Sequence, residues 1–238
     1  MIPKAELSVV VPARDEAENL EPLLREIEET LLLPGLPVEV IVVDDGSRDD
    51  TPALLQELAR RHAWLVAVRR EESAGQSAAI GTGICVARGA AIATLDADLQ
   101  NDPADLPGLW EIVRSGRADL AQGIRSPRRD PAARRAAAAV GRLVRRILLK
   151  DPTRDTGCAT RVFTAELGKR FPLHFRGMHR FLPVYARMLG ARVVEVPVSH
   201  RPRRAGRSKY GVWNRAVSGL VDCLAVRWML RRYRPPGA

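Results

Sequence analysis

The chain has 238 residues, of which 46% are hydrophobic and 28% are charged, and its formal net charge at pH 7 is +10. These values are typical of a globular domain and exclude a chain that is disordered throughout. The three cysteines, Cys85, Cys158 and Cys223, form no CxxC pair, which argues against a zinc ribbon, a redox dithiol or a disulfide scaffold and favours a reducing compartment. Without a signal-peptide pattern or a run of about 18 uncharged apolar residues, we expect no membrane-spanning helix.

Short apolar segments alternate with helical patterns through residue 124. The first segment, Leu7 to Pro12, is almost entirely apolar, as in strands that are buried on both faces. Asp15 and Asp102 are expected to cap the helices that follow them. The alternation predicts an α/β fold, a doubly wound and mostly parallel sheet with helices on both faces. The strands are expected at residues 7–12, 38–43, 65–68, 91–95 and 119–124.

After residue 124 the alternation stops. A long Arg- and Ala-rich helix is expected over 131–149, strands over 159–164 and 193–198, and a last helix over 213–232. We therefore predict one domain over 1–211, composed of a 1–124 half and a 125–211 half with an α+β C-terminal extension. Residues 212–238 would form an amphipathic helix and a tail.

Charge is distributed unevenly between the two halves. Residues 1–122 contain 11 Lys and Arg against 22 Asp and Glu, whereas residues 123–238 contain 27 against 6. The second half is therefore suited to a polyanion, such as anionic lipid, a phosphorylated substrate or nucleic acid, unless its arginines only form a solvated surface. Aromatic residues make up only 5% of the chain and do not cluster among the arginines, so we expect no nucleic-acid partner.

Polar residues follow three of the predicted strands, at the sheet edge where α/β proteins bind ligands. The carboxylates of Asp96 and Asp98 are spaced so that both can reach one divalent cation, and Gln100 adds a neutral oxygen. This donor set suits Mg²⁺ or Mn²⁺ shared with substrate phosphates, although a DxD sequence alone is a weak signal. The other two strand ends contribute Pro12 to Glu16 and Asp44 to Ser47. No GxxxxGK[ST] occurs, and no GxGxxG follows the first strand, so P-loop and dinucleotide enzymes are disfavoured.

Several ordered motifs resemble those of the family 2 glycosyltransferases, which have the GT-A fold. They are VVVPARDEAENL (9–20), VVDDGSRDDT (42–51), GQSAAIGTG (75–83) and TLDADLQNDP (94–103). The last of these is similar to the polyprenyl-phosphate branch, which contains the dolichyl-phosphate mannosyltransferases and their bacterial undecaprenyl-phosphate relatives. The second half agrees through DTGCATRVF (155–163), HRFLPVYARMLG (179–190) and EVPVSHRPRRAGRSKYG (195–211).

The resemblance implies a role for each matching residue. Asp98 and Arg125 would be catalytic. Arg14 departs from the family pattern, because relatives often have tyrosine at this position. His179 and His200 lie in matching motifs and would line the acceptor site. Nucleotide-sugar binding is implied for Pro12, Arg14, Glu16, Asp44, Asp45 and Asp96; metal binding for Asp96, Asp98 and Gln100; and contact with the acceptor phosphate for Arg125, Arg203 and Lys209.

The activity implied is a metal-dependent, inverting transfer of a hexose from a UDP- or GDP-sugar to a polyprenyl phosphate. The alternative is a polysaccharide or other hydroxyl acceptor, which would require an aspartate base, and Asp155 is the best candidate. A basic adaptor without catalysis is a third interpretation, but it has no use for three acidic strand ends. The implied partners are the nucleotide-sugar, the lipid phosphate and either an anionic membrane surface or a separate membrane partner.

Location follows from the lipid acceptor. Many relatives continue into two membrane-spanning helices, whereas this sequence ends soon after Trp228. We expect a cytoplasmic protein, peripheral on the inner face of the plasma membrane. The 213–232 helix would either bury its apolar stripe on the sheet or lie on the leaflet beside the 131–149 helix. The stripe is Trp213, Val217, Leu220, Val221, Leu224 and Trp228, and the arginines expected to meet lipid headgroups are Arg134, Arg135, Arg142, Arg145 and Arg146.

Overall fold

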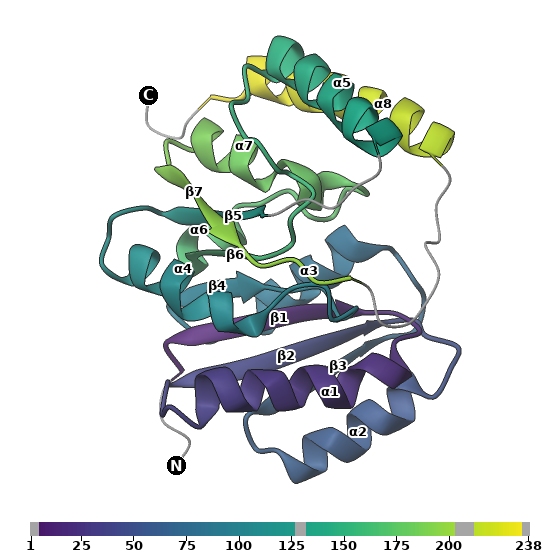
Figure 1. Cartoon of the computed structure of the whole chain (residues 1–238), viewed down its shortest axis with the longest axis vertical. Coiled ribbons are helices and arrows are strands. Elements are labelled where there is room, and N and C mark those ends of the chain that lie inside the picture. Colours follow the sequence, from purple (N-terminus) through teal and green to yellow (C-terminus); the bar gives the residue numbers. More distant parts are fainter. Residues whose placement is uncertain (1–4, 127–131, 203–211, 235–238) are drawn as a thin grey trace.

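The computed structural model describes residues 5–126, 132–202 and 212–234 (Figure 1). Its seven strands form one sheet in the order β3-β2-β1-β4-β6-β5-β7, and β6 alone runs antiparallel to its neighbours among these strands. The predicted α/β architecture is therefore confirmed. The strands are β1 (Leu7–Ala13), β2 (Val38–Asp45), β3 (Leu65–Arg70), β4 (Ala91–Thr94), β5 (Leu120–Arg125), β6 (Arg161–Thr164) and β7 (Val193–Val198).

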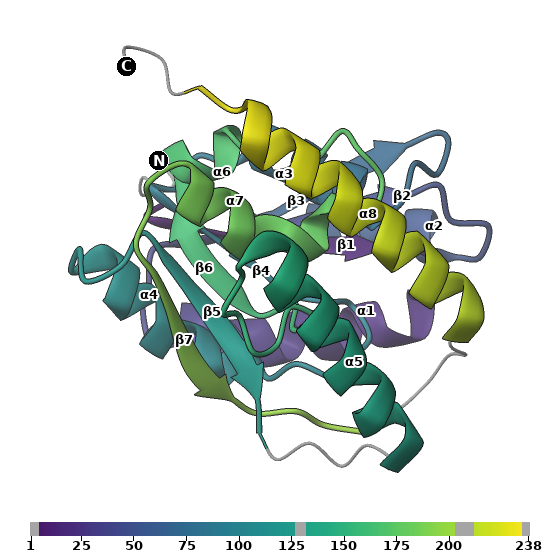
Figure 2. The same ribbon diagram turned by 90° about the horizontal axis from the view of Figure 1, so that it is seen from above.

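Helices cover both faces of the sheet (Figures 1 and 2). One face is packed by α1 (Ala17–Ile27), which continues as η1 (Glu28–Leu32), by α2 (Thr51–Arg61) and by η2 (Pro103–Asp105) with α4 (Leu106–Arg114). The opposite face is packed by α3 (Gln76–Val86), α6 (Ala165–Lys169), η3 (Met178–Phe181) and α7 (Leu182–Met188). The remaining helices, α5 (Ala132–Leu149) and α8 (Val212–Arg232), lie side by side outside α7.

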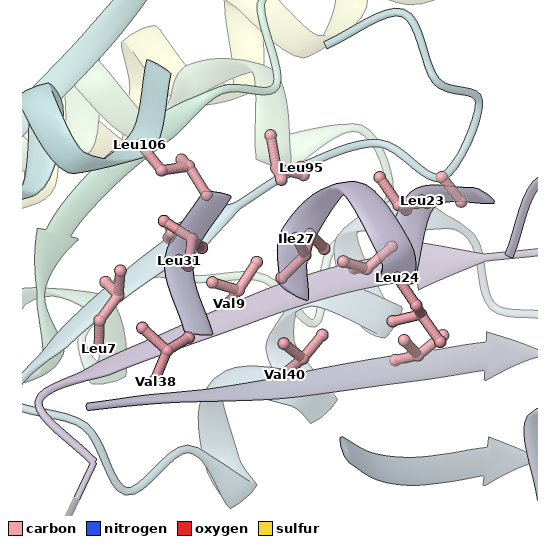
Figure 3. Close-up of a cluster of buried hydrophobic side chains, with 14 of the residues drawn as sticks. Leu7, Val9, Leu23, Leu24, Ile27, Leu31, Val38, Val40, Leu95 and Leu106 are labelled. Atoms are coloured by element: carbon pink, nitrogen blue, oxygen red, sulfur yellow. The ribbon is translucent and has the colours of Figure 1, made fainter. Parts of the chain in front are cut away.

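The apolar pattern of the first 60 residues explains why the first layers form. All eight residues of β2 are buried, as expected for a central parallel strand with helices on both sides. On α1, Leu23, Leu24 and Ile27 repeat at helical spacing and turn toward Val9 and Val40 on the sheet (Figure 3). This packing fixes the loops that leave the carboxyl ends of β1 and β2.

The place of β6 in the sheet and three short helices of the second half, α6, η3 and α7, were not predicted. Strand β6 lies in the sheet between β4 and β5. In a regular doubly wound order β5 would be the neighbour of β4, and here it is not. Helix α7 was missed because its residues are buried all round rather than on one face, which removes the periodicity that identifies an amphipathic helix. Among the described residues, no helix is both long enough and apolar enough to cross a bilayer.

Candidate functional site

A cavity of about 290 Å³ opens beyond the carboxyl ends of the central strands. Pro12 from β1, Asp96 from the loop after β4 and Arg125 at the end of β5 contribute to its walls, together with Gln76 at the start of α3. The cavity therefore brings together two of the three strand ends that were predicted to meet, those of Pro12 and Asp96, whereas no residue of Asp44 to Ser47 lines it. Its other lining residues are Ile80, Thr94, Leu95, Thr156, Gly157, Ala159, Arg161, His179 and Arg180.

The loops after β1 and β2 are tied together by hydrogen bonds. The backbone N–H of Asp15 donates to Ser47 Oγ at 2.8 Å, and the Arg48 N–H donates to Asp15 Oδ1 at 2.8 Å. Asp15 adopts a φ of 52°, which is uncommon for a residue with a side chain and marks a constrained loop. The prediction that Asp15 caps α1 is wrong, because its carboxylate is used between the loops and the N-cap position belongs to Glu16.

Glu16 and Arg14 lie in the same loop. Glu16 accepts a hydrogen bond from Asn19 Nδ2 at 2.6 Å, and its backbone N–H donates to Thr51 Oγ1 at 2.9 Å. Arg14 donates to Ser73 Oγ at 3.0 Å from a partly exposed position. Their predicted nucleotide contacts stay predictions, and the geometry places both residues beside the loop that contains Asp44.

The two aspartates at the end of β2 differ in their surroundings. Asp44 is fully buried, and its Oδ1 accepts hydrogen bonds from the backbone and side chain of Ser47. Its Oδ2 is buried, accepts no hydrogen bond from the described residues, and lies 3.9 Å from Arg69 Nε. A buried acceptor without a donor is costly, so Asp44 Oδ2 is suited to receive an N–H group from a ligand.

Asp45 is instead committed to the protein. Its carboxylate accepts from Ser73 Oγ, from the Ala74 N–H and from the Gly75 N–H, and it lies 3.1 Å from Arg70 Nε. Burial raises the pKa of this carboxyl, but the hydrogen bonds and Arg70 outweigh burial and hold it below its usual value. Asp45 therefore anchors loop 71–75 against the end of β2, and its predicted nucleotide contact stays a prediction.

Gly46 allows this close approach of the two loops. Its φ is +69°, and a Cβ built at this position would lie 2.8 Å from the backbone nitrogen of Ser73. A side chain at residue 46 would therefore push loop 71–75 away from Asp45.

The predicted metal ligands share one short loop. Asp96 Oδ1 accepts from Gln76 Nε2 at 2.7 Å, and Asp98 Oδ1 accepts from the Gln100 N–H at 3.3 Å. Gln100 also donates from Nε2 to the Arg201 carbonyl at 3.4 Å, and Leu99 between them has a φ of 60°. The loop thus offers two carboxylates and an amide, which fit a hard cation that takes its other ligands from phosphates. No cluster of three or more His, Cys, Asp or Glu suited to a metal occurs within the described residues.

Arg125 forms a two-pronged ion pair with Asp155. Its Nε and Nη2 each lie 2.8 Å from one carboxylate oxygen, and its backbone N–H donates to Asp155 Oδ2 at 3.2 Å. The Asp155 side chain is 4% exposed and that of Arg125 is 21% exposed. A Cβ on Gly157 would lie 2.8 Å from Arg125 Nη2, so a side chain at this position would displace the guanidinium.

A second hollow lies on the other side of this ion pair. It has a volume of about 490 Å³ and is lined by Ile124, Asp155 and residues of α5. Asp155 therefore lines this hollow while its partner Arg125 lines the first cavity. The positive side chains around the hollow are Arg142, Arg146 and Arg154.

Arg161 is a cavity residue that the sequence did not single out, whereas its neighbour His179 was expected to line the acceptor site. Arg161 is 3% exposed and donates to the carbonyls of Cys158 and, at 2.7 Å, His179. His179 Nδ1 lies 2.8 Å from Ser77 Oγ. The available signal for Arg161 was its place in the motif DTGCATRVF (155–163), but that motif does not say which of its residues lines a cavity.

The basic loop that was predicted to meet the phosphates begins beside the site. Arg201 lies 2.6 Å from Glu26 and 2.5 Å from Asp102, and its N–H donates to the Gln100 carbonyl at 2.8 Å. Asp102 accepts from the Ala104 N–H, which confirms its predicted helix cap. Arg203 and Lys209 lie outside the described residues.

Comparison with known proteins identifies the family. The model of glycosyl transferase family 2 matches residues 8–174, which includes every acidic strand end and the Arg125–Asp155 pair. The chain belongs to glycosyltransferase family 2. The relatives below place it in the polyprenyl-phosphate branch, as the motifs had indicated.

Two curated relatives of this family 2 glycosyltransferase act on lipid phosphates, according to their names. An undecaprenyl-phosphate 4-deoxy-4-formamido-L-arabinose transferase of Edwardsiella ictaluri is 35% identical over 222 residues, covering 92% of this chain and 67% of the relative. A dodecaprenyl-phosphate galacturonate synthase of Rhizobium johnstonii is 34% identical over 241 residues, covering 98% of this chain and 69% of the relative. The chain thus spans about two thirds of the length of the curated relatives it matches.

Solved structures share the GT-A fold of this glycosyltransferase. A mannosyltransferase from Pyrobaculum calidifontis in complex with GDP-Man and Mn²⁺ superposes with a TM-score of 0.70 at 24% identity, covering 97% of this chain and 66% of that one. A glucosyl-3-phosphoglycerate synthase from Mycobacterium tuberculosis in complex with Mn²⁺, UDP and glucosyl-3-phosphoglycerate has a TM-score of 0.67 at 21% identity. The match covers 94% of this chain and 80% of that one. At these identities the likeness establishes the fold alone.

Proposed function

We propose that this enzyme transfers a sugar from a UDP- or GDP-sugar to a polyprenyl phosphate, with inversion at the anomeric carbon. The observation that supports this most is the single cavity with Asp96 on one wall and Arg125 on another. In the reaction, an oxygen of the lipid phosphate attacks the anomeric carbon. The bond from that carbon to the diphosphate breaks, and its electron pair leaves with the nucleoside diphosphate. A cavity lined by a metal-binding carboxylate and an arginine can hold both anions.

The direct test is a transfer assay. We expect release of nucleoside diphosphate from at least one of UDP-glucose, UDP-galacturonate and GDP-mannose when undecaprenyl phosphate and Mg²⁺ or Mn²⁺ are present, and much slower release without the lipid. Equal release with and without the lipid would contradict the proposed acceptor. No release from any donor under either condition would contradict transfer from these donors.

The diphosphate would lie at the loop after β4. Asp96, Asp98 and Gln100 are the residues that would hold Mg²⁺ or Mn²⁺. When bound, the cation neutralises the charge that builds up on the departing diphosphate. Asp98 is 8% exposed and lies two residues after Asp96, at which the lining segment of the cavity ends.

The nucleotide would bind across the ends of β1 and β2. Pro12, Arg14 and Glu16 would hold the base and ribose, and Asp44 would accept an N–H from the edge of uracil or guanine. Asp44 Oδ2, which no described residue supplies with a hydrogen bond, supports this assignment, because a base N–H would supply one.

Replacing Asp44 should therefore weaken donor binding more than it slows the bound complex. Asp44→Asn keeps a side-chain oxygen that can accept the hydrogen bonds from Ser47. Its amide nitrogen would replace Oδ2, so that an N–H donor would face the N–H donor of the base. We expect the KM for the nucleotide-sugar to rise about 10- to 100-fold with little change in kcat, since the contact exists in ground state and transition state alike. Calorimetry with UDP and GDP measures the affinity directly, and unchanged affinity for both would contradict the base contact.

The acceptor phosphate would meet Arg125, with Arg203 and Lys209 contributing from the basic loop. A phosphate dianion is already a nucleophile, so the site needs arginine to position it rather than a strong base. The hollow beyond the Arg125–Asp155 pair, with Arg142 and Arg146 on α5, would be the approach of the lipid phosphate to the cavity.

A hydroxyl acceptor is less well supported. It would require a base, and Asp155 was the best candidate in the sequence. Both of its carboxylate oxygens already accept hydrogen bonds from Arg125, so the carboxylate is held by a cation instead of being turned toward an incoming hydroxyl. This contact favours the phosphate acceptor.

The chain would act at the inner face of the plasma membrane, bound through α5 and α8. Seven of the ten large apolar side chains that are exposed among the described residues lie on these two helices, and a concentration of this kind marks an interaction surface. We call these seven residues the apolar strip: Val140, Leu143 and Ile147 on α5, and Leu220, Val221, Leu224 and Trp228 on α8. An anionic bilayer is the occupant we propose, because arginines flank the strip and the proposed acceptor is a lipid.

The structure corrects part of the earlier expectation for these helices. The alternative in which the stripe of α8 is buried on the sheet is wrong for Leu220, Val221, Leu224 and Trp228, which are 48 to 61% exposed. Arg145 was expected to face lipid headgroups, but it pairs with the buried Asp151 at 3.0 Å. Arg142 and Arg146 remain near the surface, and the side chains of Trp213, Val217, Arg134 and Arg135 lie outside the described residues.

Binding to liposomes tests this surface. We expect the protein to sediment with anionic vesicles at low salt and to be released at high salt, since each arginine near the surface contributes about 1 kcal/mol of screened attraction. Leu224→Glu should weaken this binding about tenfold, because it removes an apolar contact and adds a repelled charge. The matched control is Leu33→Glu, an exposed leucine at the end of η1, which should bind normally. Failure of the unmodified protein to bind at low salt would reject direct docking in favour of a membrane partner.

With these assignments, residues 1–211 would form the transferase domain. The 1–124 part would bind the nucleotide-sugar and the 125–211 part the acceptor. Residues 212–238 would supply the docking helix and a tail.

A further inference from the structure

His179 has a fixed orientation at the cavity wall. It belongs to η3, whose Met178 and Phe181 are buried in the core, and its carbonyl accepts a hydrogen bond from the buried Arg161 at 2.7 Å. The ring is held as well, with Nδ1 2.8 Å from Ser77 Oγ. Both ends of the residue are therefore tied to the protein before any ligand binds.

The hydrogen bonds of Ser77 decide which ring nitrogen carries the proton. Ser77 is 1% exposed, and its Oγ accepts from the His179 backbone N–H at 3.1 Å. The buried hydroxyl must also donate its own hydrogen, and within the described residues the only acceptor it contacts is His179 Nδ1. Nδ1 therefore accepts, and the hydrogen of the neutral ring is on Nε2.

The ring also stays uncharged. Burial, together with the positive charges of Arg180 and Arg161, lowers the pKa of His179 to about 3. Its Nε2 makes no hydrogen bond within the described residues and is not among their buried polar atoms that lack a partner, so it is accessible from the cavity that His179 lines. The protein thus presents one neutral N–H donor to the cavity near the working pH of an enzyme.

The place of this donor indicates its ligand. In the proposed function the diphosphate lies at Asp96 and the acceptor phosphate at Arg125, so the transferred sugar must occupy the cavity between them. The base would lie at Asp44, which does not line this cavity. A neutral donor suits a sugar hydroxyl, and unlike a cation it does not repel the positive charge that develops at the anomeric carbon.

We infer that His179 binds the donor sugar, its Nε2–H donating a hydrogen bond to one hydroxyl of the transferred sugar, and that Ser77 positions the ring for this contact. This inference rests on the proposed function. It adds a sugar-binding residue to a site for which the sequence had indicated the nucleotide, metal and acceptor contacts, and it moves His179 from the predicted acceptor site to the donor sugar.

Two substitutions separate the two sides of the ring. His179→Asn keeps an amide near the position of Nδ1, which can bond Ser77, but does not reach the cavity. His179→Gln extends an amide toward the position of Nε2 and should restore part of the contact. His174→Asn is the control, because His174 is exposed and does not line the cavity.

The decisive measurement is binding without acceptor, by calorimetry with UDP, GDP, UDP-glucose, UDP-galacturonate and GDP-mannose in Mn²⁺. We expect His179→Asn to lower the affinity for the best-bound nucleotide-sugar about tenfold, which corresponds to the loss of one neutral hydrogen bond. The affinity for the matching nucleoside diphosphate should stay unchanged. His179→Gln should fall between His179→Asn and the unmodified protein, and His174→Asn should match the unmodified protein. A deoxy series of that donor should show one position at which the His179→Asn penalty disappears.

Three results would overturn the inference. An equal loss of affinity for the nucleoside diphosphate and for the nucleotide-sugar would mean that His179 supports the nucleotide site or the fold instead of binding the sugar. Unchanged affinity for both would mean that His179 makes no contact with the donor. If the unmodified protein binds no nucleotide-sugar at all, the donor side of the proposed function fails and the sugar contact fails with it, whereas normal donor binding without transfer to undecaprenyl phosphate overturns only the acceptor.

Discussion

Asp98→Asn should lower kcat/KM for sugar transfer about a thousandfold while leaving the unfolding temperature of the protein unchanged. The substitution removes the negative charge that would attract the proposed divalent cation but keeps the shape of the side chain. Its remaining oxygen can still accept the Gln100 N–H that Asp98 Oδ1 accepts at 3.3 Å. The expected loss is therefore one of charge stabilisation on the departing diphosphate, not of loop structure.

Asp96→Asn is expected to behave in the same way, since the amide oxygen can keep the hydrogen bond from Gln76. The matched control is Asp102→Asn, a nearby aspartate that caps η2 and pairs with Arg201. We expect this control to lose at most about 1 kcal/mol of stability and to retain most of its activity. Near-normal activity of Asp98→Asn at saturating Mg²⁺ or Mn²⁺ would remove Asp98 from the metal site.

The first half of the fold could be predicted because its signals are local. Leu7 to Pro12 and Val38 to Val43 are apolar runs with helical patterns between them, and such runs specify buried parallel strands without reference to the rest of the chain. The cap at Asp102 was also predictable, because the cap and the N–H it accepts lie only two residues apart. Asp15 also precedes a predicted helix, but its carboxylate bonds residue 48, and no local pattern predicts a partner 33 residues away.

The second half depends on contacts over long sequence distances. Strand β6 pairs with β4 and β5, which lie about 70 and 40 residues earlier, and four residues contain too little pattern to specify this antiparallel insertion. The candidate site follows the same division. The meeting of three acidic strand ends followed from topology, whereas the difference between Asp44 and Asp45 arises from loop 71–75, which packs against only one of them.

Arg125→Ala should abolish most transfer to undecaprenyl phosphate and leave donor affinity intact. Arginine positions a phosphate through two parallel N–H contacts, and their loss should lower kcat/KM for the lipid about 100- to 1,000-fold. Arg125→Lys should restore only part of the activity, because lysine keeps the charge but has no planar fork. Donor affinity is measured by calorimetry with the nucleotide-sugar and Mn²⁺.

The buried Asp155 makes one further variant necessary. Removing the guanidinium from a carboxylate that is only 4% exposed should by itself destabilise the fold, by about 3 to 5 kcal/mol for a buried pair. The double variant Arg125→Ala with Asp155→Asn removes both charges and should recover much of this stability. If Arg125 acts on the acceptor phosphate, the double variant stays inactive toward the lipid while it folds and binds the donor. Recovery of transfer together with stability would show that Arg125 serves the fold alone, and a parallel loss of donor affinity in the stable double variant would assign Arg125 to the donor site.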